Sequence, residues 1–422
     1  VTPPNWFSGP FNISFQEQKK CNWWLIDDFS NGEIKVIWEK SRFEWLILMA
    51  LNIRSGRQEE ILKINTWLDD WSEKNSPYLG PNWKCGQEAS IRVLHLIISC
   101  WILGQINSPN LNLIKLIQIH LKRIEPTISY AIGQQNNHAV TEAAALFVGG
   151  SFLLGHEKKA KRWMDKGRLL LERSAQNLLD IDGTFSQYSV NYHRLMLDSF
   201  SISKAWQVKH KLPEFSLNFQ NRLQNATYWL FNLTSAENGQ TPNIGANDSA
   251  RILPLTKCDL KDFRPSIQLA AALFMDSDAY GAGPWNLPLK ILGIPNGQLE
   301  IKEKSISFNR GGFHILKTPK SMAVLRYPRF KFRPSQADAL HLDFWHRGEN
   351  ILRDAGSYSY NSKDTSWFAG TSAHNTICFD NRDQMPRLGR FLFGAWLKTS
   401  QVEYVRHDRN KVSAAASYID IY

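Results

Sequence analysis

The first two thirds of the chain carry apolar residues at the spacing of amphipathic helices. In residues 38–54, Leu46, Ile47 and Ala50 fall on one helical face, and Gly56 follows as a helix stop. Links containing Gly, Pro or Asn separate this segment from those after it. So many successive helices without strands predict a helical array or an incomplete (α/α) toroid. The further predicted helices cover residues 58–74, 86–104, 109–128, 138–154, 157–178, 192–209, 216–234 and 262–276.

The pattern changes after residues 293–297. From residue 305 on, short runs alternate between apolar and polar positions, which is typical of strands. They predict an antiparallel β-sandwich, so we expect an α+β fold with a helical domain at 1–290 and a sandwich domain at 300–422. The chain ends inside another alternating segment, so we expect the sandwich to be C-terminally truncated. The predicted strands are 305–308, 312–317, 322–327, 340–346, 351–354 and 376–379.

Composition narrows the class of protein. With 43% hydrophobic and 21% charged residues, the chain is typical of globular proteins. Its longest apolar run, residues 43–53, contains Glu44 and is too short to span a bilayer, so no membrane span is predicted. No signal peptide is visible at the start. The five cysteines are odd in number and widely spaced, which favours small buried residues over a disulfide framework or a zinc knuckle.

The net charge of +11 favours an acidic partner. Nucleic acid and acidic polysaccharide both fit that requirement. The positive residues are dispersed, and none of the usual nucleic-acid-binding motifs occurs. An acidic glycan is therefore the favoured partner, and nucleic acid is not expected.

A first polar cluster, Gln134-Gln-Asn-Asn-His138, precedes the predicted helix at 138–154. Asn136 or Asn137 can serve simply as the N-cap, because an Asn side chain accepts a free N–H of the first helical turn. The alternative is a carboxylate-binding site made by the positive helix end, the Asn amides and His138. Two adjacent Asn residues flanked by Gln and His exceed what a cap needs.

Two aromatic positions are further candidates. Tyr192 and His193 stand at the start of the predicted helix 192–209, although a Tyr beside a helix is more often half-buried packing. Trp83 follows a Gly-Pro-Asn turn and is a candidate platform for stacking a sugar ring. Most of the other tryptophans are expected in the core.

A third cluster lies among the predicted strands. Its Asp and His residues suffice for a metal site or an acid/base pair, while the simpler interpretation is that each is a solvated edge residue. Alternation puts Asp338 on one face and His341 with Asp343 on the other. The cluster comprises Asp338, His341, Asp343, His346, Asp354 and His374.

Taken together, these motifs resemble the heparinase II/III-like family of polysaccharide lyases, whose members join a helical toroid to an antiparallel β-sandwich. The resemblance runs over nearly the whole chain. Its most specific part is the succession Ala337-Asp-Ala-Leu340, Leu352-Arg-Asp-Ala-Gly-Ser-Tyr358 and Ala373-His-Asn-Thr376. Its other parts are Gly80-Pro-Asn-Trp83, Glu88-Ala-Ser-Ile-Arg92, Gln135-Asn-Asn-His138, Tyr192-His193 and Pro242-Asn-Ile-Gly-Ala-Asn-Asp248.

The resemblance implies β-elimination on a glycan that contains uronic acid. Asn137 and His138 match the pair that neutralises the uronate carboxylate, and Tyr192 matches the catalytic Tyr. A free phenol titrates near ~10, so a phenol acting as base needs its pKa lowered. The implied substrate-binding residues are Gln135, Asn136, Trp83, Arg92, His193, Gln336 and His374.

One position departs from the family pattern. Where many members have a His two residues before the first Asp, this chain has Gln336, which neither takes a proton at neutral pH nor binds zinc well. Asp338 and His374 remain as ligands for a structural zinc, but the ligand set is incomplete. No cofactor is required by the implied reaction.

The departure leaves three functions open. A lyase of an acidic polysaccharide leads. A non-catalytic glycan-binding protein of envelope or exopolysaccharide assembly is the alternative. Sequences with Gln at position 336 resemble the branch of the family that is found near enzymes of surface-polysaccharide assembly. A glycoside hydrolase needs an Asp/Glu pair, drawn from Glu88, Glu142, Asp182 or Asp248. The resemblance places the protein in the periplasm or cell envelope, and the sequence leaves its oligomeric state open.

Overall fold

The computed structural model describes residues 2–421, and the chain falls into two compact units. The first unit comprises Val1–Arg173, Ile202–Leu212 and Ile252–Leu255. The second comprises Ser174–Ser201, Pro213–Arg251 and Thr256–Tyr422. Helices α8 (Ala160–Leu178) and α9 (Val190–Lys209) each contribute residues to both units.

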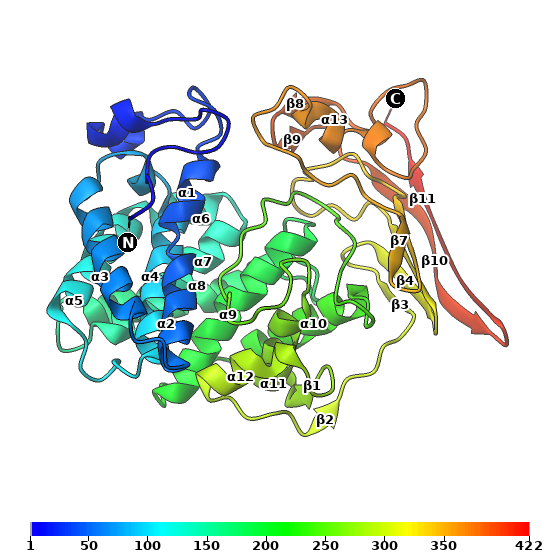
Figure 1. Cartoon of the computed structure of the whole chain (residues 1–422). Coiled ribbons are helices and arrows are strands. Elements are labelled where there is room, and N and C mark those ends of the chain that lie inside the picture. Colours follow the sequence, from blue (N-terminus) through cyan, green and yellow to red (C-terminus); the bar gives the residue numbers. More distant parts are fainter. Residues whose placement is uncertain (1, 422) are drawn as a thin grey trace. The chain divides into compact units, whose positions relative to one another are not determined.

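The first unit is helical. Its largest element is α4 (Gly86–Ile102), in which every residue from Gln87 to Ile102 is buried. Figure 1 labels these helices along the chain. Besides α4, the helices are α1 (Lys35–Ser41), α2 (Glu44–Arg54), α3 (Glu60–Lys74), α5 (Leu111–Ile124), α6 (Ile128–Gly133), α7 (Asn137–Phe152) and most of α8, with short 3₁₀ turns at η1 (Gln16–Lys20), η2 (Trp23–Leu25), η3 (Pro81–Trp83) and η4 (Glu125–Thr127).

The predicted helix at 38–54 is wrong in one respect, because the structure divides it into α1 and α2. The break falls at Phe43, whose backbone is left-handed with φ of 65°. That conformation is unfavourable for a bulky residue. Burial of the ring offsets it: Phe43 is fully buried and packs edge-on against Trp71, with ring centroids 4.9 Å apart.

Two buried charged side chains of α4, Glu88 and Arg92, have hydrogen-bond partners. Glu88 accepts two hydrogen bonds from the Arg42 guanidinium, at 2.7 and 2.9 Å. Arg92 donates to His120 at 2.9 Å and to the carbonyl of Asn82 at 2.7 Å. Charges buried in this way are tolerated only when they are paired, so these residues are structural.

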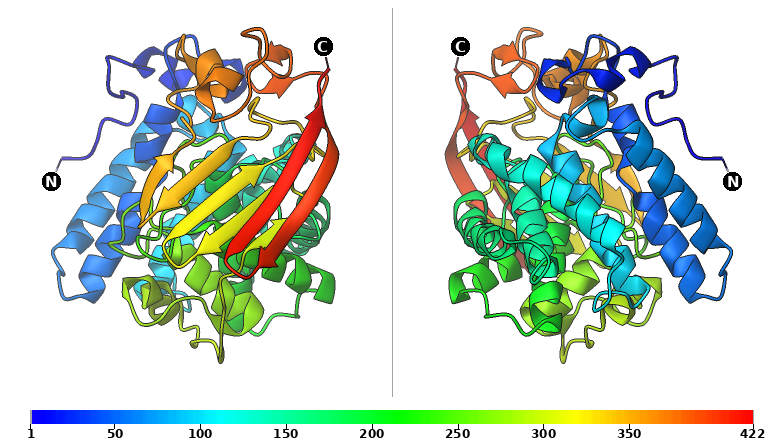
Figure 2. Two further views of the ribbon diagram at one scale, coloured as in Figure 1. Left: turned by 90° about the vertical axis from the view of Figure 1, so that its right-hand side faces the viewer. Right: turned by 90° about the vertical axis from the view of Figure 1, so that its left-hand side faces the viewer.

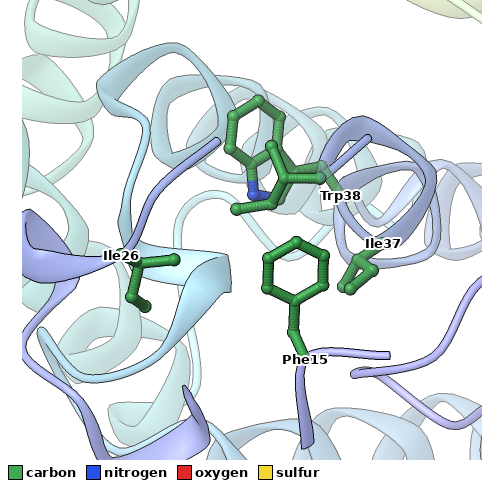
Figure 3. Packing of buried hydrophobic residues seen from close by; sticks show 5 residues of the cluster. Phe15, Ile26, Ile37 and Trp38 are labelled. Atoms are coloured by element: carbon green, nitrogen blue, oxygen red, sulfur yellow. The ribbon is translucent and has the colours of Figure 1, made fainter. Parts of the chain in front are cut away.

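A separate apolar cluster anchors the N-terminal segment of the first unit. Phe15 and Ile26 from this segment pack with Ile37 and Trp38 of α1 (Figure 3). The Trp38 indole N–H also donates to the carbonyl of Pro81 at 2.9 Å. Burial of these side chains therefore fixes a segment that has little regular structure of its own.

The second unit combines helices with mainly antiparallel sheets, and the predicted α+β class is confirmed. Strands β3 to β7 form one five-stranded antiparallel sheet in chain order, and β10 pairs with β11 in a long hairpin (Figure 2). Short pairs β1–β2 and β8–β9 stand apart from that sheet.

The helices of the second unit are α9, α10 (Leu217–Leu233), α11 (Arg264–Met275), α12 (Leu287–Leu292) and α13 (Thr365–Ala369), with 3₁₀ turns at η5 (Pro284–Asn286) and η6 (Thr371–Ala373). The strands are β1 (Ser277–Asp278), β2 (Leu299–Glu300), β3 (Ile306–Phe308), β4 (Phe313–Thr318), β5 (Ser321–Arg326), β6 (Leu342–His346), β7 (Glu349–Leu352), β8 (Arg387–Gly389), β9 (Leu392–Phe393), β10 (Lys398–Asp408) and β11 (Lys411–Ile419). Helices give way to strands between α12 and β3, and the domain limits 1–290 and 300–422 stay a prediction.

One face of the five-stranded sheet packs on helix α10. The ring of Phe313 on β4 meets Trp229 edge-on, with centroids 5.3 Å apart. Strand β5 alternates between buried and half-buried residues, as expected for a sheet with one covered face. The predicted strand 376–379 is wrong: Ile377 and Phe379 are about half exposed, and Thr376 bonds by its hydroxyl to the carbonyl of Ala339.

Among residues 2–421, no helix combines the length and the apolar character that crossing a bilayer requires.

Helices α7 and α8 approach closely at Gly167, where a Cβ atom would lie 2.3 Å from the backbone nitrogen of Phe147. We expect Gly167→Ala to lower the melting temperature by several degrees, because backbone on both sides must move. Gly133→Ala is the matched control, since a Cβ there meets nothing within 4 Å. Thermal unfolding of the two variants tests this packing, and equal melting temperatures would contradict it.

Candidate active site

The first turn of α9 is held against the loop at residues 242–248, and both belong to the second unit. Ser189 precedes the helix, accepts the Tyr192 N–H at 3.1 Å and donates to the carbonyl of Ala246 at 2.6 Å. Gly245 has φ of 81°, and a Cβ there would lie 2.4 Å from the carbonyl oxygen of Tyr188. Glycine is therefore required for this close approach.

Tyr192 lies in a buried polar environment. Only 8% of the residue is exposed, and its phenol oxygen lies 3.1 Å from that of Tyr360, which is equally buried. Burial raises the pKa of the Tyr192 phenol well above 10, and the Asp248 carboxylate and the Tyr360 phenol beside it raise it further. In this environment the phenol is neutral at neutral pH, and the lowered pKa expected of a phenol that acts as base is not found.

Gln336 stands where a family His was expected. Its side-chain oxygen accepts the backbone N–H of Gly245 at 3.0 Å, and 3% of the residue is exposed. The amide therefore holds the 242–248 loop to the segment between β5 and β6. In this position Gln336 supports the loop that carries Asp248.

Asp338 does not join His374, contrary to the predicted metal pair. Its carboxylate forms a buried ion pair with Arg326, the last residue of β5. The guanidinium also lies over the rings of Tyr188 and Phe330, 5.4 and 5.5 Å from their centroids. Burial lowers the pKa of Arg326 to about 10, so the guanidinium remains charged at neutral pH.

His374 instead lies beside Asp354 and His341. These three buried residues offer donor atoms that all lie within 4.8 Å of one another. His374 Nδ1 is 3.3 Å from Asp354 Oδ2, and His341 Nε2 is 3.9 Å from the same oxygen. Among the described residues none of these atoms has a hydrogen-bond partner. The interpretation of these residues as solvated edge residues is therefore wrong.

The spacing fits a small divalent metal. In a tetrahedral site with metal–nitrogen distances of about 2.0–2.1 Å, neighbouring ligand atoms lie roughly 3.4 Å apart. One adjustment is required, because His341 Nδ1 accepts the N–H of Asn375 at 3.1 Å. A neutral imidazole then carries its proton on Nε2, so ligation by that nitrogen requires the Asn375 bond to be released. Asp354 Oδ2 and His374 Nδ1 can bind a metal without the loss of a hydrogen bond.

In the first unit the Asn cluster opens helix α7. Asn136 is the N-cap and accepts the His138 N–H at 3.0 Å, which confirms the capping interpretation for this residue. Asn137 is buried, His138 is half-buried, and Gln135 is exposed with a left-handed backbone. One turn further on, burial raises the pKa of Glu142 to about 8, against the opposing effect of His138.

Three predicted substrate-binding residues are core residues. Trp83 is 1% exposed, packs near His120 and donates its indole N–H to the carbonyl of Asn75, so its faces are not available to a sugar. Arg92 is fully buried in the network already described. His193 stacks on Trp229 and is fully buried, and burial lowers its pKa to about 3. The turn signals around Trp83 did not reveal its depth.

Two of the four carboxylates proposed for a hydrolase have other partners. Glu88 is bound by Arg42, and Asp182 accepts the backbone N–H groups of Arg310 and Gly311 at 2.7 and 3.0 Å. These two carboxylates are structural. Sequence reasoning missed Tyr360 and Arg326 altogether, and the only signal for Tyr360 was its place two residues after the motif that ends at Tyr358.

Comparisons with known proteins agree with this description. The family model for the heparinase II/III N-terminus matches residues 5–263, and that for the heparinase II/III-like C-terminal region matches residues 300–420. The chain belongs to the heparinase II/III family. These matches cover both the helices and the sheet.

Two curated relatives are heparin-sulfate lyases. That of Bacteroides thetaiotaomicron is 22% identical over 390 residues, which are 83% of this chain and 52% of the relative. That of Bacteroides stercoris is 21% identical over 263 residues, which are 59% of this chain and 36% of the relative. The chain therefore spans about half or less of the length of these relatives.

Solved structures show the same fold. The crystal structure of heparinase III matches with a TM-score of 0.62 and 16% identity, over 99% of this chain and 71% of that one. The heparan sulfate lyase HepC of Pedobacter heparinus, in a mutant form, matches with a TM-score of 0.54 and 19% identity, over 96% of this chain and 62% of that one. At these identities the likeness concerns the fold.

The buried ion pair gives a stability prediction. Asp338→Asn leaves the Arg326 charge buried and unpaired, and we expect a loss of about 3–5 kcal/mol in the free energy of unfolding. The exposed pair Asp380–Arg382 is the control, because Asp380→Asn removes a carboxylate that is 79% exposed. Denaturant unfolding measures both variants. Equal stabilities would show that Asp338 is not the partner of Arg326.

Proposed function

We propose that this protein is a polysaccharide lyase that cleaves a uronic-acid-containing polysaccharide by β-elimination. The observation that carries the proposal is the buried Tyr192 phenol at the start of α9, which contacts the Tyr360 phenol and has the Asp248 carboxylate as a neighbour. Family membership and the lyase relatives support the reaction type. The net charge of +11 supports an acidic substrate.

In this reaction the proton at C5 of the uronate is removed and the glycosidic oxygen at C4 leaves. Removal is favourable only when the carboxylate attached to C5 is neutralised, because negative charge develops there. Asn137 and His138 are the predicted neutralising pair. Tyr192 is the proposed group that exchanges protons with the substrate.

Glycan binding without cleavage is the second candidate, and the contact of Gln336 favours it. A side-chain amide bonded to the Gly245 N–H takes no proton, so Gln336 supplies no base at this position. The two functions are distinguished by the product. Elimination leaves a C4–C5 double bond conjugated with the carboxylate, which absorbs in the near ultraviolet.

Removal of the phenol oxygen tests the lyase directly. On a uronate polymer that the wild type cleaves, Tyr192→Phe should lower the rate of ultraviolet-absorbing product formation by ~10²–10⁴-fold, since it removes a general acid or base. Tyr358→Phe is the matched control, because Tyr358 is 71% exposed. If Tyr192→Phe retains the wild-type rate, Tyr192 is not the catalyst; binding without any product supports the second candidate.

A structural metal fits the second unit. Asp354 and His374, with His341 after loss of its Asn375 bond, would hold a divalent ion such as zinc. Its charge would compensate the buried carboxylate and brace the segment that begins at Asp354. The proposed reaction needs no chemistry from the ion.

Metal binding is tested by thermal unfolding and by elemental analysis. Added zinc should raise the melting temperature of metal-free protein, and His374→Ala should abolish that rise because it removes a ligand. His346→Ala controls for general zinc binding, since His346 is exposed at the end of β6. Elemental analysis should find about one zinc per chain. No bound zinc and an unchanged melting temperature would exclude the site.

The predicted location, periplasm or cell envelope, stays a prediction.

A further inference from the structure

Asp248 is fixed against the first turn of α9 by its own loop. Its Oδ1 accepts the backbone N–H of Ala250 at 3.1 Å and lies 3.5 Å from the side-chain nitrogen of Asn191. The same loop is held to the helix through Ser189 and to the segment between β5 and β6 through Gln336. Anchors on both sides therefore hold the carboxylate where it acts on Tyr192.

Tyr360, at the end of the segment 354–360, contacts Tyr192 through its phenol oxygen. Asp354 accepts the Gly356 N–H at 2.7 Å, and Ser357 accepts the Asn247 N–H at 3.3 Å. Beside Gly356 there is no room for a side chain, since a Cβ would lie 1.9 Å from the Asn243 amide nitrogen. The segment and the 242–248 loop are thus packed together, with Tyr360 at the end of the segment.

The Tyr192 phenol consequently has two titratable neighbours, Asp248 and Tyr360. Asp248 lies beside the Tyr192 phenol, and the Tyr192 and Tyr360 oxygens are 3.1 Å apart. Asp248, from the 242–248 loop, is a charged group that acts on this phenol, and Tyr360, from the irregular segment after β7, is a second titratable group. An isolated buried phenol is a poor base, because losing its proton creates a buried anion. A neighbouring carboxylate removes that obstacle by accepting the proton in the same step.

We propose that Asp248, Tyr192 and Tyr360 together form a proton relay for β-elimination. The inference rests on the proposed lyase function and adds two residues that act together with Tyr192. Asp248 positions the Tyr192 phenol and holds its proton during the reaction, so it acts through Tyr192. Tyr360 is the residue that hands the proton to the leaving oxygen.

The steps balance without any further reactant. The Tyr192 oxygen takes the C5 proton while its own proton passes to the Asp248 carboxylate, and the C5–H bond breaks. Its electron pair forms the C4–C5 double bond as the C4–O bond breaks. The Tyr360 phenol gives its proton to the departing oxygen, takes one from Tyr192, and Tyr192 takes back the proton from Asp248. All three groups return to their starting states.

Asp248→Asn tests the relay through the pH dependence of the rate. In the wild type the rate depends on ionised Asp248, so it falls as the pH drops through the pKa of that carboxyl. In Asp248→Asn the rate at neutral pH should be ~10²–10⁴-fold lower. The remaining activity should rise about tenfold per pH unit into the alkaline range, because the phenol must then ionise unaided.

Two variants control this result. Asp248→Glu retains a carboxylate and should recover part of the rate and the acid limb of the profile. Asp259→Asn changes an exposed carboxylate of the following loop and should leave both unchanged. A wild-type profile in Asp248→Asn overturns the relay and leaves the lyase function standing.

A measurement without substrate separates the relay from the function. Fluorotyrosine placed at position 192 ionises at lower pH than tyrosine, and its fluorine resonance reports the ionisation. Removing the neighbouring anion in Asp248→Asn should lower the midpoint by about one pH unit or more. An unchanged midpoint contradicts the relay even if no polysaccharide is cleaved.

Tyr360→Phe tests the second half of the relay. It should lower kcat on a polysaccharide by ~10²-fold or more, because the sugar oxygen leaves unprotonated. On a synthetic uronide whose C4 substituent is a phenol, which leaves readily as the anion, Tyr360→Phe should match the wild type while Asp248→Asn stays slow. Equal defects of Tyr360→Phe on both substrates would show that Tyr360 does not protonate the leaving oxygen.

Discussion

The contact between two buried phenols, Tyr192 and Tyr360, is the interaction on which the account depends. Each comes from a different kind of element: Tyr192 from the first turn of α9, and Tyr360 from the irregular segment after β7. The contact exists because the 242–248 loop joins these elements. Burial beside the Asp248 carboxylate then sets the chemistry, since it keeps the Tyr192 phenol protonated until a proton can be exchanged.

Helical periodicity predicted the larger helices within a few residues of their ends, because their apolar faces repeat over several turns. It failed at Phe43, where burial of one aromatic ring in a left-handed conformation interrupts a continuous apolar pattern. The antiparallel strands were also predicted from alternation. The segment 376–379 alternates too, yet its side chains bond to neighbouring loops and its backbone joins no sheet. Alternation alone does not reveal whether a partner strand is present.

The site was harder to predict than the fold, since depth and pairing are tertiary properties. Asp338 looked like a metal ligand until Arg326, twelve residues earlier in the chain, proved to be its partner. Trp83 followed a turn, which suggested exposure, but it is a core residue. By contrast, the capping role of Asn136 depends on local hydrogen bonds, and the sequence contained that information. The roles of Asn137 and His138 remain predictions.

The most direct test is a crystal structure of the Tyr192→Phe protein bound to an acidic oligosaccharide that the wild type cleaves. The account predicts a uronate ring with C5 within roughly 3–3.5 Å of the site of the missing phenol oxygen, and its C4 oxygen next to Tyr360. A sugar bound with C5 remote from residue 192, or a phenol pair that no sugar atom approaches, would contradict it.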